Sequence, residues 1–352
     1  MLFHNAALLS VAAEIPPRVV ASTAIENELA PVYERLKLPA GRLELMSGIR
    51  ERRFWHDGMR PSRAAALAGE KALAAAGLPR EKIGCLINAS VCRDFMEPAT
   101  ASLVHSILGL SARCQIFDLS NACLGVLNAV CQLAAMLDLG IIDAGLIVAG
   151  EVAEPLHRAT VKKLLADKTL TRQSIKNHFA SLTIGSGAVG VVVANRQKFG
   201  GHQILGGAGL TNSAANKLCR EDTAEISAAG PLMATDSEKL LRAGCELAAE
   251  TWRLAAAELG WTNDTPDRFF THQVGSAHSK LLFESLGLDA AKDFPTYPRY
   301  GNTGAAALPT ALATAMTEKP FAAGEKIALL GIGSGLSSMM LGAEMSETLT
   351  TP

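Results

Sequence analysis

Apolar runs rich in valine, isoleucine and alanine alternate with amphipathic stretches along the whole chain. Strand-like runs occupy residues 85–89, 115–119, 145–149, 189–194, 269–272 and 326–331, and helix-like stretches occupy residues 62–76, 122–137, 238–259 and 304–316. Strands that are apolar throughout and lie between helices are typical of a sheet covered on both faces. The pattern therefore predicts an α/β fold.

The order of these elements repeats within the chain. The helix at 62–76 precedes the strand at 85–89, as the helix at 238–259 precedes the strand at 269–272. A nearly constant offset relates Leu110 to Leu288 and Cys123 to Asn302, which is a duplication signal. We therefore predict two duplicated halves, residues 1–195 and 196–352. Because ligands of open α/β sheets bind at the carboxyl ends of strands, we expect Cys123 and Asn302 to approach each other across a shared cleft.

Composition narrows the classes of function. Charged residues make up 19% of the chain and the net charge is −1, so a nucleic-acid surface is not expected. The N-terminus lacks a basic region, and the uncharged stretch between Asp118 and Asp138 contains polar residues, so we expect neither a signal peptide nor membrane insertion. Seven cysteines without C-x-x-C spacing argue against a disulfide framework or a zinc site and favour the cytoplasm.

The segment at about 155–178 has no counterpart in the second half. It carries six lysines and arginines against a single acid, Asp167. It is interpreted either as a solvated helix or dimer-contact insertion, or as a basic lip that attracts phosphates over a cleft.

Three polar residues at predicted strand ends could together perform chemistry. Cys123 lies where a strand meets a helix, and the free amides and dipole of a helix N-terminus are expected to lower the pKa of such a thiol. His272 ends a strand and Asn302 opens a helix. Each of the three alone is more often structural. Together they supply a nucleophile and two hydrogen-bond donors, which suits thioester acyl transfer.

Five phrases carry a family resemblance: GIRERR at 48–53, DLSNACLG at 118–125, HQ at 272–273, NTGAA at 302–306 and GIGSG at 331–335. With these, the chain resembles the ketoacyl-ACP synthase III branch of the thiolase superfamily over nearly its whole length. The resemblance implies a five-layered αβαβα thiolase fold, a homodimer and a catalytic triad of Cys123, His272 and Asn302. It also implies an oxyanion hole formed by the amide of Cys123 and the loop that contains Gly333, Ser334 and Gly335.

Two further phrases, SVCRDFMEPATAS at 90–102 and NKLCR at 216–220, look most like the OleA-type enzymes of that branch. Such enzymes condense two fatty acyl-CoAs head to head in olefin and β-lactone pathways. The resemblance implies that Glu97 is a base that reaches into the active site of the partner subunit. Without that context, Glu97 is a loop carboxylate with a local hydrogen bond. Degradative thiolases match less well, because they carry a second cysteine where this chain has residues 331–335.

The resemblance implies acyl-CoA substrates, with an acyl carrier protein as the alternative carrier, and no cofactor or metal. Arg50, Arg52 and Arg53 are candidate substrate-binding residues at a tunnel mouth. One alternative function is decarboxylative condensation of an acyl-CoA with malonyl-ACP, in which Glu97 is incidental. Another is a non-catalytic partner subunit, which retention of all three triad residues disfavours.

Overall fold

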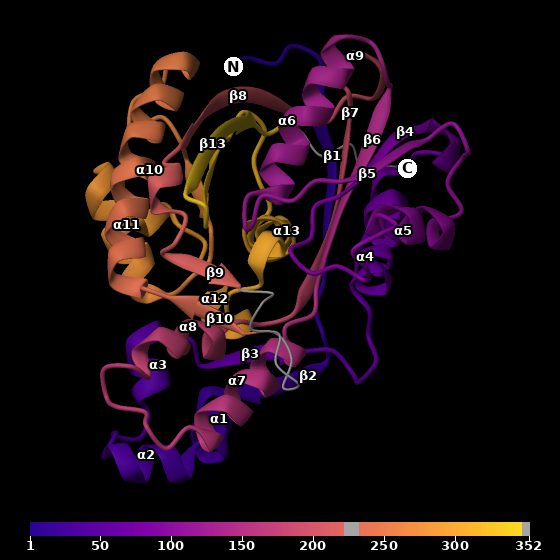
Figure 1. Cartoon of the computed structure of the whole chain (residues 1–352). Coiled ribbons are helices and arrows are strands. Elements are labelled where there is room, and N and C mark those ends of the chain that lie inside the picture. Colours follow the sequence, from indigo (N-terminus) through magenta and orange to yellow (C-terminus); the bar gives the residue numbers. More distant parts are fainter. Residues whose placement is uncertain (222–231, 347–352) are drawn as a thin grey trace.

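The computed structural model describes residues 1–221 and 232–346, and its centre is a nine-stranded mixed sheet (Figure 1). The strand order is β11-β12-β13-β8-β1-β7-β6-β4-β5. The strands are β1 (Ala6–Glu14), β4 (Ile83–Asn88), β5 (Gln115–Asp118), β6 (Ala144–Glu151), β7 (Gly187–Asn195), β8 (His202–Thr211), β11 (Arg268–Thr271), β12 (Lys326–Gly333) and β13 (Ser337–Glu344). Two short ribbons pair β2 (Arg18–Ala21) with β3 (Glu51–Phe54) and β9 (Cys219–Glu221) with β10 (Met233–Thr235).

The two halves of the sheet have the same strand order. In the first half the order is β1-β7-β6-β4-β5. In the second it is β8-β13-β12-β11, followed by an isolated bridge between Phe269 and Asp293 where a fifth strand would lie. Only Ala7 and Leu8 of β1 pair with β8 at the seam between them. The division at 195/196 remains a prediction, and residues 222–231 and 347–352 of the predicted C-terminal half lie outside the described residues.

Helices form three layers around the two half-sheets. Figure 1 shows α6 (Gly125–Asp138) and α13 (Ala307–Glu318) between the half-sheets, α4 (Pro61–Ala76) and α5 (Thr100–Leu108) outside the first, and α10 (Ser237–Leu259) and α11 (Ser276–Leu286) outside the second. The central core draws on both half-sheets and on both inner helices, with Leu133 and Ala311 among its fully buried members. Burial of apolar area in these layers is the main stabilising contribution.

Small residues allow α4 to approach the sheet closely. A Cβ atom built on Gly190 of β7 would lie 2.4 Å from the carbonyl oxygen of Ala68 in α4. No side chain fits at that distance, so the alanine-rich helix and the glycine are required together. This explains why the first predicted helix is so rich in alanine.

A helical cap lies below the half-sheets in the view of Figure 1. It contains α1 (Ser22–Glu28), α2 (Ala30–Leu36), α3 (Arg42–Ser47), α7 (Glu154–Ala166) and α8 (Lys176–Thr183). Its own core includes the fully buried Ile25, Leu29, Leu164 and Leu182. The remaining helical segments of the described residues are α9 (Arg196–Phe199), α12 (Tyr297–Tyr300), η1 (Arg80–Lys82), η2 (Ser213–Ala215), η4 (Ala290–Lys292) and η5 (Gly304–Ala306). Within residues 1–221 and 232–346, no helix has both the length and the apolar character that crossing a membrane requires.

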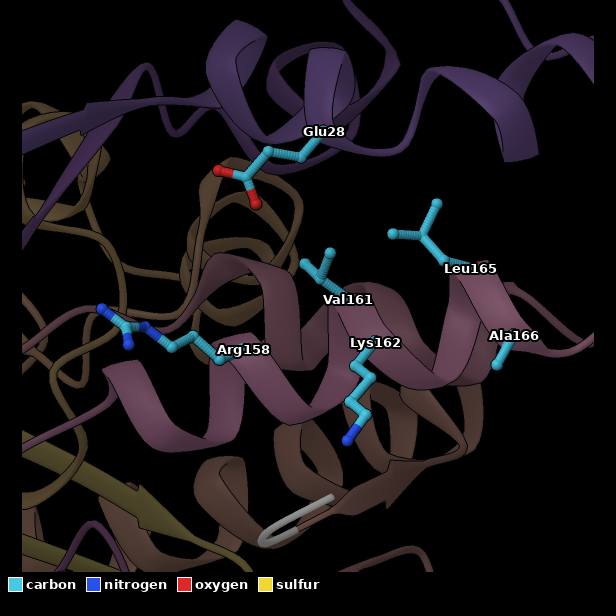
Figure 2. A pocket seen from close by; sticks show the side chains of 6 residues that line it. All are labelled: Glu28, Arg158, Val161, Lys162, Leu165 and Ala166. Carbon is cyan, nitrogen blue, oxygen red and sulfur yellow. The ribbon is translucent and has the colours of Figure 1, made fainter.

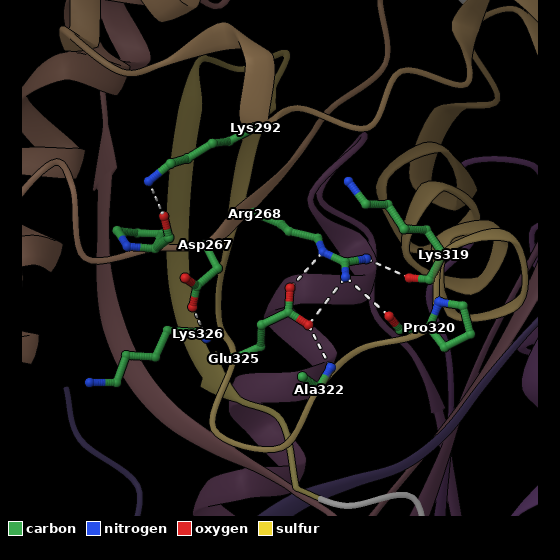
Figure 3. A network of polar contacts seen from close by, with 9 residues as sticks. Asp267, Arg268, Lys292, Lys319, Pro320, Ala322, Glu325 and Lys326 are labelled. Atoms are coloured by element: carbon green, nitrogen blue, oxygen red, sulfur yellow. Dashed lines mark hydrogen bonds and ion pairs between the residues drawn. The ribbon is translucent and has the colours of Figure 1, made fainter.

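A polar network fixes the amino ends of β11 and β12 (Figure 3). Arg268 Nε donates to Glu325 Oε1 at 2.8 Å, and Arg268 also donates to the backbone carbonyl of Pro320 at 3.1 Å. The second carboxylate oxygen of Glu325 accepts the N–H of Ala322 at 2.7 Å. Only 11% and 17% of the Arg268 and Glu325 side chains are exposed, so solvent screens this ion pair weakly.

We expect Glu325→Gln to lower the free energy of unfolding by about 3 kcal/mol, because the guanidinium of Arg268 stays buried without its anion. Urea denaturation at neutral pH measures the change. Lys239→Gln is the control, because Lys239 forms an exposed ion pair with Asp236. Equal effects of the two substitutions would contradict a stabilising role for the buried pair.

Candidate active site

Cys123 lies in a tight turn between β5 and α6. The helix begins at Gly125 and not at residue 122 as expected, because Ala122 has a left-handed φ of 46° that no continuous helix accommodates. The turn is closed by a hydrogen bond of 3.0 Å from the N–H of Leu124 to the carbonyl oxygen of Asn121. Non-glycine residues with positive φ are strained and occur often at functional sites. The turn therefore presents Cys123 ahead of the helix N-terminus.

Gly125 lets this turn rest on the end of β4. A Cβ atom built on Gly125 would lie 2.4 Å from the carbonyl oxygen of Ala89, so any side chain would push the helix away. Cys123 is thereby held close to the carboxyl end of the sheet, where open α/β proteins bind ligands.

The pKa of Cys123 differs from the expectation. Burial, with smaller contributions from the Glu151 carboxylate and the Cys219 thiol, raises the pKa of Cys123 to about 12. A backbone hydrogen bond at Cys123 itself acts in the lowering direction but is outweighed. The predicted lowering by the helix N-terminus is therefore wrong for the free enzyme, and Cys123 is a neutral thiol at neutral pH.

We expect the alkylation rate of Cys123 by iodoacetamide to rise about tenfold per pH unit from about pH 7 to about pH 10, without a plateau, because only the thiolate reacts. Peptide mapping measures the rate at this cysteine. Cys85, a fully buried core cysteine whose pKa burial raises to about 12, is the internal reference for closed sites. A plateau at Cys123 below pH 8 would show that the helix N-terminus stabilises the thiolate after all.

His272 follows β11 directly and is buried, with 6% of its surface exposed. Its backbone N–H donates to the carbonyl oxygen of Leu330 in β12 at 3.1 Å. Burial, together with the neighbouring His278, lowers the pKa of His272 to about 3, so the imidazole is neutral. Its Nδ1 atom has no hydrogen-bond partner among the described residues. A neutral imidazole has one N–H to donate and one nitrogen to accept a proton.

Asn302 is held by its backbone and by its own side chain. Its N–H donates to the carbonyl oxygen of Thr183 at 3.1 Å, and its carbonyl oxygen accepts from Gly185 at 2.9 Å. Its side-chain Oδ1 accepts the N–H of Gly304 at 3.0 Å. The amide oxygen is therefore occupied, which orients the two N–H groups of Nδ2 as donors for another group.

The loop between β12 and β13 lies against the Cys123 turn. A Cβ atom built on Gly333 would lie 3.1 Å from the Leu124 side chain and 3.4 Å from the carbonyl oxygen of Asn121. Gly333 ends β12, and Ser334 and Gly335 follow it in the loop between β12 and β13. Because β11 and β12 are parallel neighbours, His272 and this loop emerge at the same edge of the sheet.

Glu97 lies in the loop between β4 and α5, and it is exposed. Its neighbours Phe95 and Met96 are 43% and 90% exposed although both are apolar. The structure of one chain therefore presents Glu97 on the surface, whereas His272 is buried.

The sequence interpretation missed Glu151, the last residue of β6. It is 4% exposed, and its carboxylate accepts the backbone N–H groups of Val91 at 2.9 Å and Cys92 at 3.1 Å. Burial raises its pKa. The sequence did contain a signal for this residue, because an acid at the end of an otherwise apolar strand indicates a candidate site residue.

The three candidate arginines have different surroundings. Arg52 is completely buried and donates to Ser22 Oγ at 3.0 Å, so the expected place at a tunnel mouth is wrong for this residue. Burial lowers its pKa to about 10. Arg53 pairs with Glu51 at 2.8 Å, and only Arg50 is exposed.

Two cations of the basic segment have protein partners on the surface. Arg158 contacts Glu154 at 2.8 Å and Asp57 at 2.9 Å, and Arg172 Nε donates to the carbonyl oxygen of Leu36 at 2.6 Å. An open hollow of about 500 Å³ lies on α1 and α7. Figure 2 shows residues that line it, among them Arg158, Lys162 and Glu28. None of the predicted catalytic residues lines it, so this hollow is separate from the candidate site.

Within residues 1–221 and 232–346, no cluster of histidine, cysteine or carboxylate side chains could hold a metal ion. The groups that the candidate site offers for chemistry are the thiol of Cys123, the imidazole of His272, the side-chain amide of Asn302 and backbone N–H donors.

Sequence comparison finds relatives over nearly the whole chain. Residues 256–342 match the family model described as 3-Oxoacyl-[acyl-carrier-protein (ACP)] synthase III C terminal. The acyl-CoA:acyl-CoA alkyltransferase of Shewanella oneidensis is 37% identical over 351 residues, covering 97% of this chain and 99% of that protein. The protein of the same name from Xanthomonas campestris pv. campestris is 38% identical over 342 residues, covering 97% and 98%.

Solved structures agree with this likeness. A crystal structure of Xanthomonas campestris OleA superposes with a TM-score of 0.93 at 36% identity, covering 98% of each chain. A cerulenin-bound structure of that protein superposes equally well. The first of these structures carries a substituted cysteine, and further structures of the same protein carry a substituted glutamate or histidine.

Proposed function

Because the chain belongs to the acyl-CoA:acyl-CoA alkyltransferase family and has the predicted thiolase fold, we propose that it joins two fatty acyl-CoAs by Claisen condensation. One observation carries the assignment of residues. In X. campestris OleA the substituted glutamate precedes the substituted cysteine by the same number of positions that separate Glu97 from Cys123. This spacing supports Glu97 and Cys123 as base and nucleophile.

The first half-reaction is acylation of Cys123. The sulfur attacks the thioester carbon of the first acyl-CoA, the carbon–sulfur bond to CoA breaks, and the thiol proton passes to the departing CoA. Backbone N–H groups of Cys123 and of the loop at Gly333, Ser334 and Gly335 hold the oxyanion. The close approach of Gly333 to the Cys123 turn supports this role.

The second half-reaction forms the carbon–carbon bond. Glu97 removes an α-proton from the second acyl-CoA, while His272 and Asn302 donate hydrogen bonds to its thioester oxygen as enolate charge develops. The α-carbon attacks the acyl group on Cys123, and the sulfur leaves with a proton to give a β-ketoacyl-CoA. The neutral imidazole of His272 and the oriented amide of Asn302 suit these donor roles.

Glu97 acts in the active site of a second copy of the chain. The outer edge of β5 ends the nine-stranded sheet, and an unpaired edge is a template for pairing with another strand. Exposed apolar residues surround this edge, including Ile116 in β5, Ile107 in α5 and Phe95 and Met96 beside Glu97. A homodimer through this face would cover the apolar patch and carry Glu97 into the partner.

Acyl-CoA binds with its headgroup near the exposed Arg50, and an acyl carrier protein is the other possible carrier. The reaction requires no cofactor beyond the thioesters. All seven cysteines are free, which supports a reducing cytoplasm as the location.

Product analysis by mass spectrometry tests the proposed function. The enzyme should form a β-keto product from fatty acyl-CoA alone. The alternative, decarboxylative condensation, predicts product only after a malonyl thioester is added. A requirement for malonyl thioester would overturn the proposal, and absence of label on Cys123 after incubation with radiolabelled acyl-CoA would exclude both enzymes.

A further inference from the structure

Glu151 connects three segments of the candidate site through one buried carboxyl group. The carboxyl accepts the N–H groups of Val91 and Cys92 and lies against the turn after Asn302: the backbone N–H of Ala305 acts to lower its pKa, and a Cβ atom built on Gly304 would lie 3.3 Å from its Cδ. Gly304 is the residue whose N–H orients the side chain of Asn302. The negative charge of Glu151 also contributes to the raised pKa of Cys123.

Glu151 makes no ion pair with a lysine, arginine or histidine whose position the structure describes. Its bonds are to backbone amides and to the side chain of Cys92, and burial raises its pKa. A buried acid without a cation is costly to keep. An apolar or amide side chain would be easier to bury at this strand end, so the carboxyl group has a role that those groups cannot perform.

The amides that Glu151 holds begin the loop that carries Glu97. Other bonds also hold this loop. Asp94, two residues after Cys92, accepts the N–H of Ser62 at 2.8 Å, and at the other end Asp118 accepts the N–H of Thr100 at 2.8 Å. The exposed residues around Glu97 lie between these two ends, so the position of the base depends on both.

We infer that Glu151 is a positioning residue for condensation, which fixes the Glu97 loop relative to the turns that carry Cys123 and Asn302. The inference rests on the proposed function. Because Glu97 serves the partner subunit, Glu151 links the nucleophile of one active site to the base of the other. Glutamine at this position keeps the size of the side chain but replaces one of its two acceptor oxygens with a donor, so it cannot accept from both Val91 and Cys92.

A double-mutant cycle tests this role. Glu151→Gln should lower the condensation rate by about 10²-fold, the typical effect of a small misplacement of a reacting group. In the Glu97→Gln background the same substitution should change the rate by no more than about twofold, because the group that it positions is already inactive. Acylation of Cys123 should fall much less than condensation. Equal losses of condensation in the two backgrounds would overturn the inference, whereas an unchanged rate for Glu97→Gln alone would overturn the proposed base.

Two controls separate positioning from general damage. Glu325→Gln makes the same chemical change in a buried carboxylate far from the site, so it should lower stability and leave the ratio of condensation to acylation unchanged. Glu151→Asp keeps both acceptor oxygens and should recover part of the lost condensation. Thermal melting of each variant shows whether it is folded.

Mixed dimers give the direction of the effect. A Cys123→Ala subunit supplies the base, and a Glu97→Gln subunit supplies the nucleophile. Glu151→Gln should impair the rescued site when it is placed in the first subunit and much less when it is placed in the second. Equal impairment from both placements would contradict action through the Glu97 loop. If the parent mixed dimer shows no rescue, the base acts within one chain, and the double-mutant cycle alone decides the role of Glu151.

Discussion

Glu97→Gln should reduce the condensation of two acyl-CoAs by a factor on the order of 10²–10⁴ while Cys123 still becomes acylated. The α-C–H of a simple acyl-CoA is weakly acidic, so carbanion formation needs a positioned base, and glutamine keeps the size of the side chain without its basicity. Mass spectrometry of the acyl-enzyme and of the β-keto product measures the two steps separately.

A malonyl thioester is the internal control for this variant, because loss of CO₂ generates the carbanion without a base. Glu97→Gln should therefore affect a malonyl reaction much less, if the enzyme accepts that substrate. Undiminished condensation of acyl-CoA by the variant would remove Glu97 from the mechanism and favour the decarboxylating synthase.

Complementation tests the place of the base. A mixed dimer of Cys123→Ala and Glu97→Gln subunits has one site in which an intact Glu97 meets an intact Cys123. It should recover activity that neither homodimer has. If both homodimers are inactive and the mixed dimer does not recover activity, Glu97 is still the base but acts in the same subunit as Cys123.

The second large effect concerns the donors to the enolate. Asn302→Ala or His272→Ala should lower condensation on the order of 10²–10³-fold, which is typical for loss of one oxyanion donor, and should leave acylation of Cys123 largely intact. Single-turnover assays with preformed acyl-enzyme measure this. Asn263→Ala is the matched control, since that amide bonds to Trp252 and the backbone away from the site.

The pKa of His272 restricts which changes of activity with pH this residue can cause. Burial lowers this pKa to about 3, so protonation of His272 cannot cause a loss of activity between about pH 5 and about pH 9.

A variant of Asn302 or His272 that condenses at the wild-type rate would contradict the donor prediction, because it would show that the substituted residue does not serve the second substrate.

The sequence was sufficient to predict the strand ends that carry the site. The six predicted strands occur within about two residues of their expected positions, because long apolar runs leave little choice of structure. β1, β8 and β13 were not predicted. In β8, Gly206 and Gly207 interrupt the apolar pattern, and both have positive φ.

Burial explains the remaining errors. The pKa of Cys123 depends on the packing around the thiol and on Glu151, which is distant in sequence, and neither follows from a helix N-terminus alone. Arg52 looked like a surface cation, but the pairing of β2 with β3 directs it into the interior. Such contacts between distant segments cannot be obtained from local pattern.

The shared central layer makes the two halves of the sheet one cooperative unit. The inner helices α6 and α13 belong to different predicted halves, yet they contribute to the same apolar core with strands of both half-sheets. Separation of the halves would expose one side of each inner helix to water. The duplication in the sequence therefore does not correspond to two independently folding domains. We expect Cys123 and Asn302, which precede α6 and α13, to lose their positions in the same unfolding step.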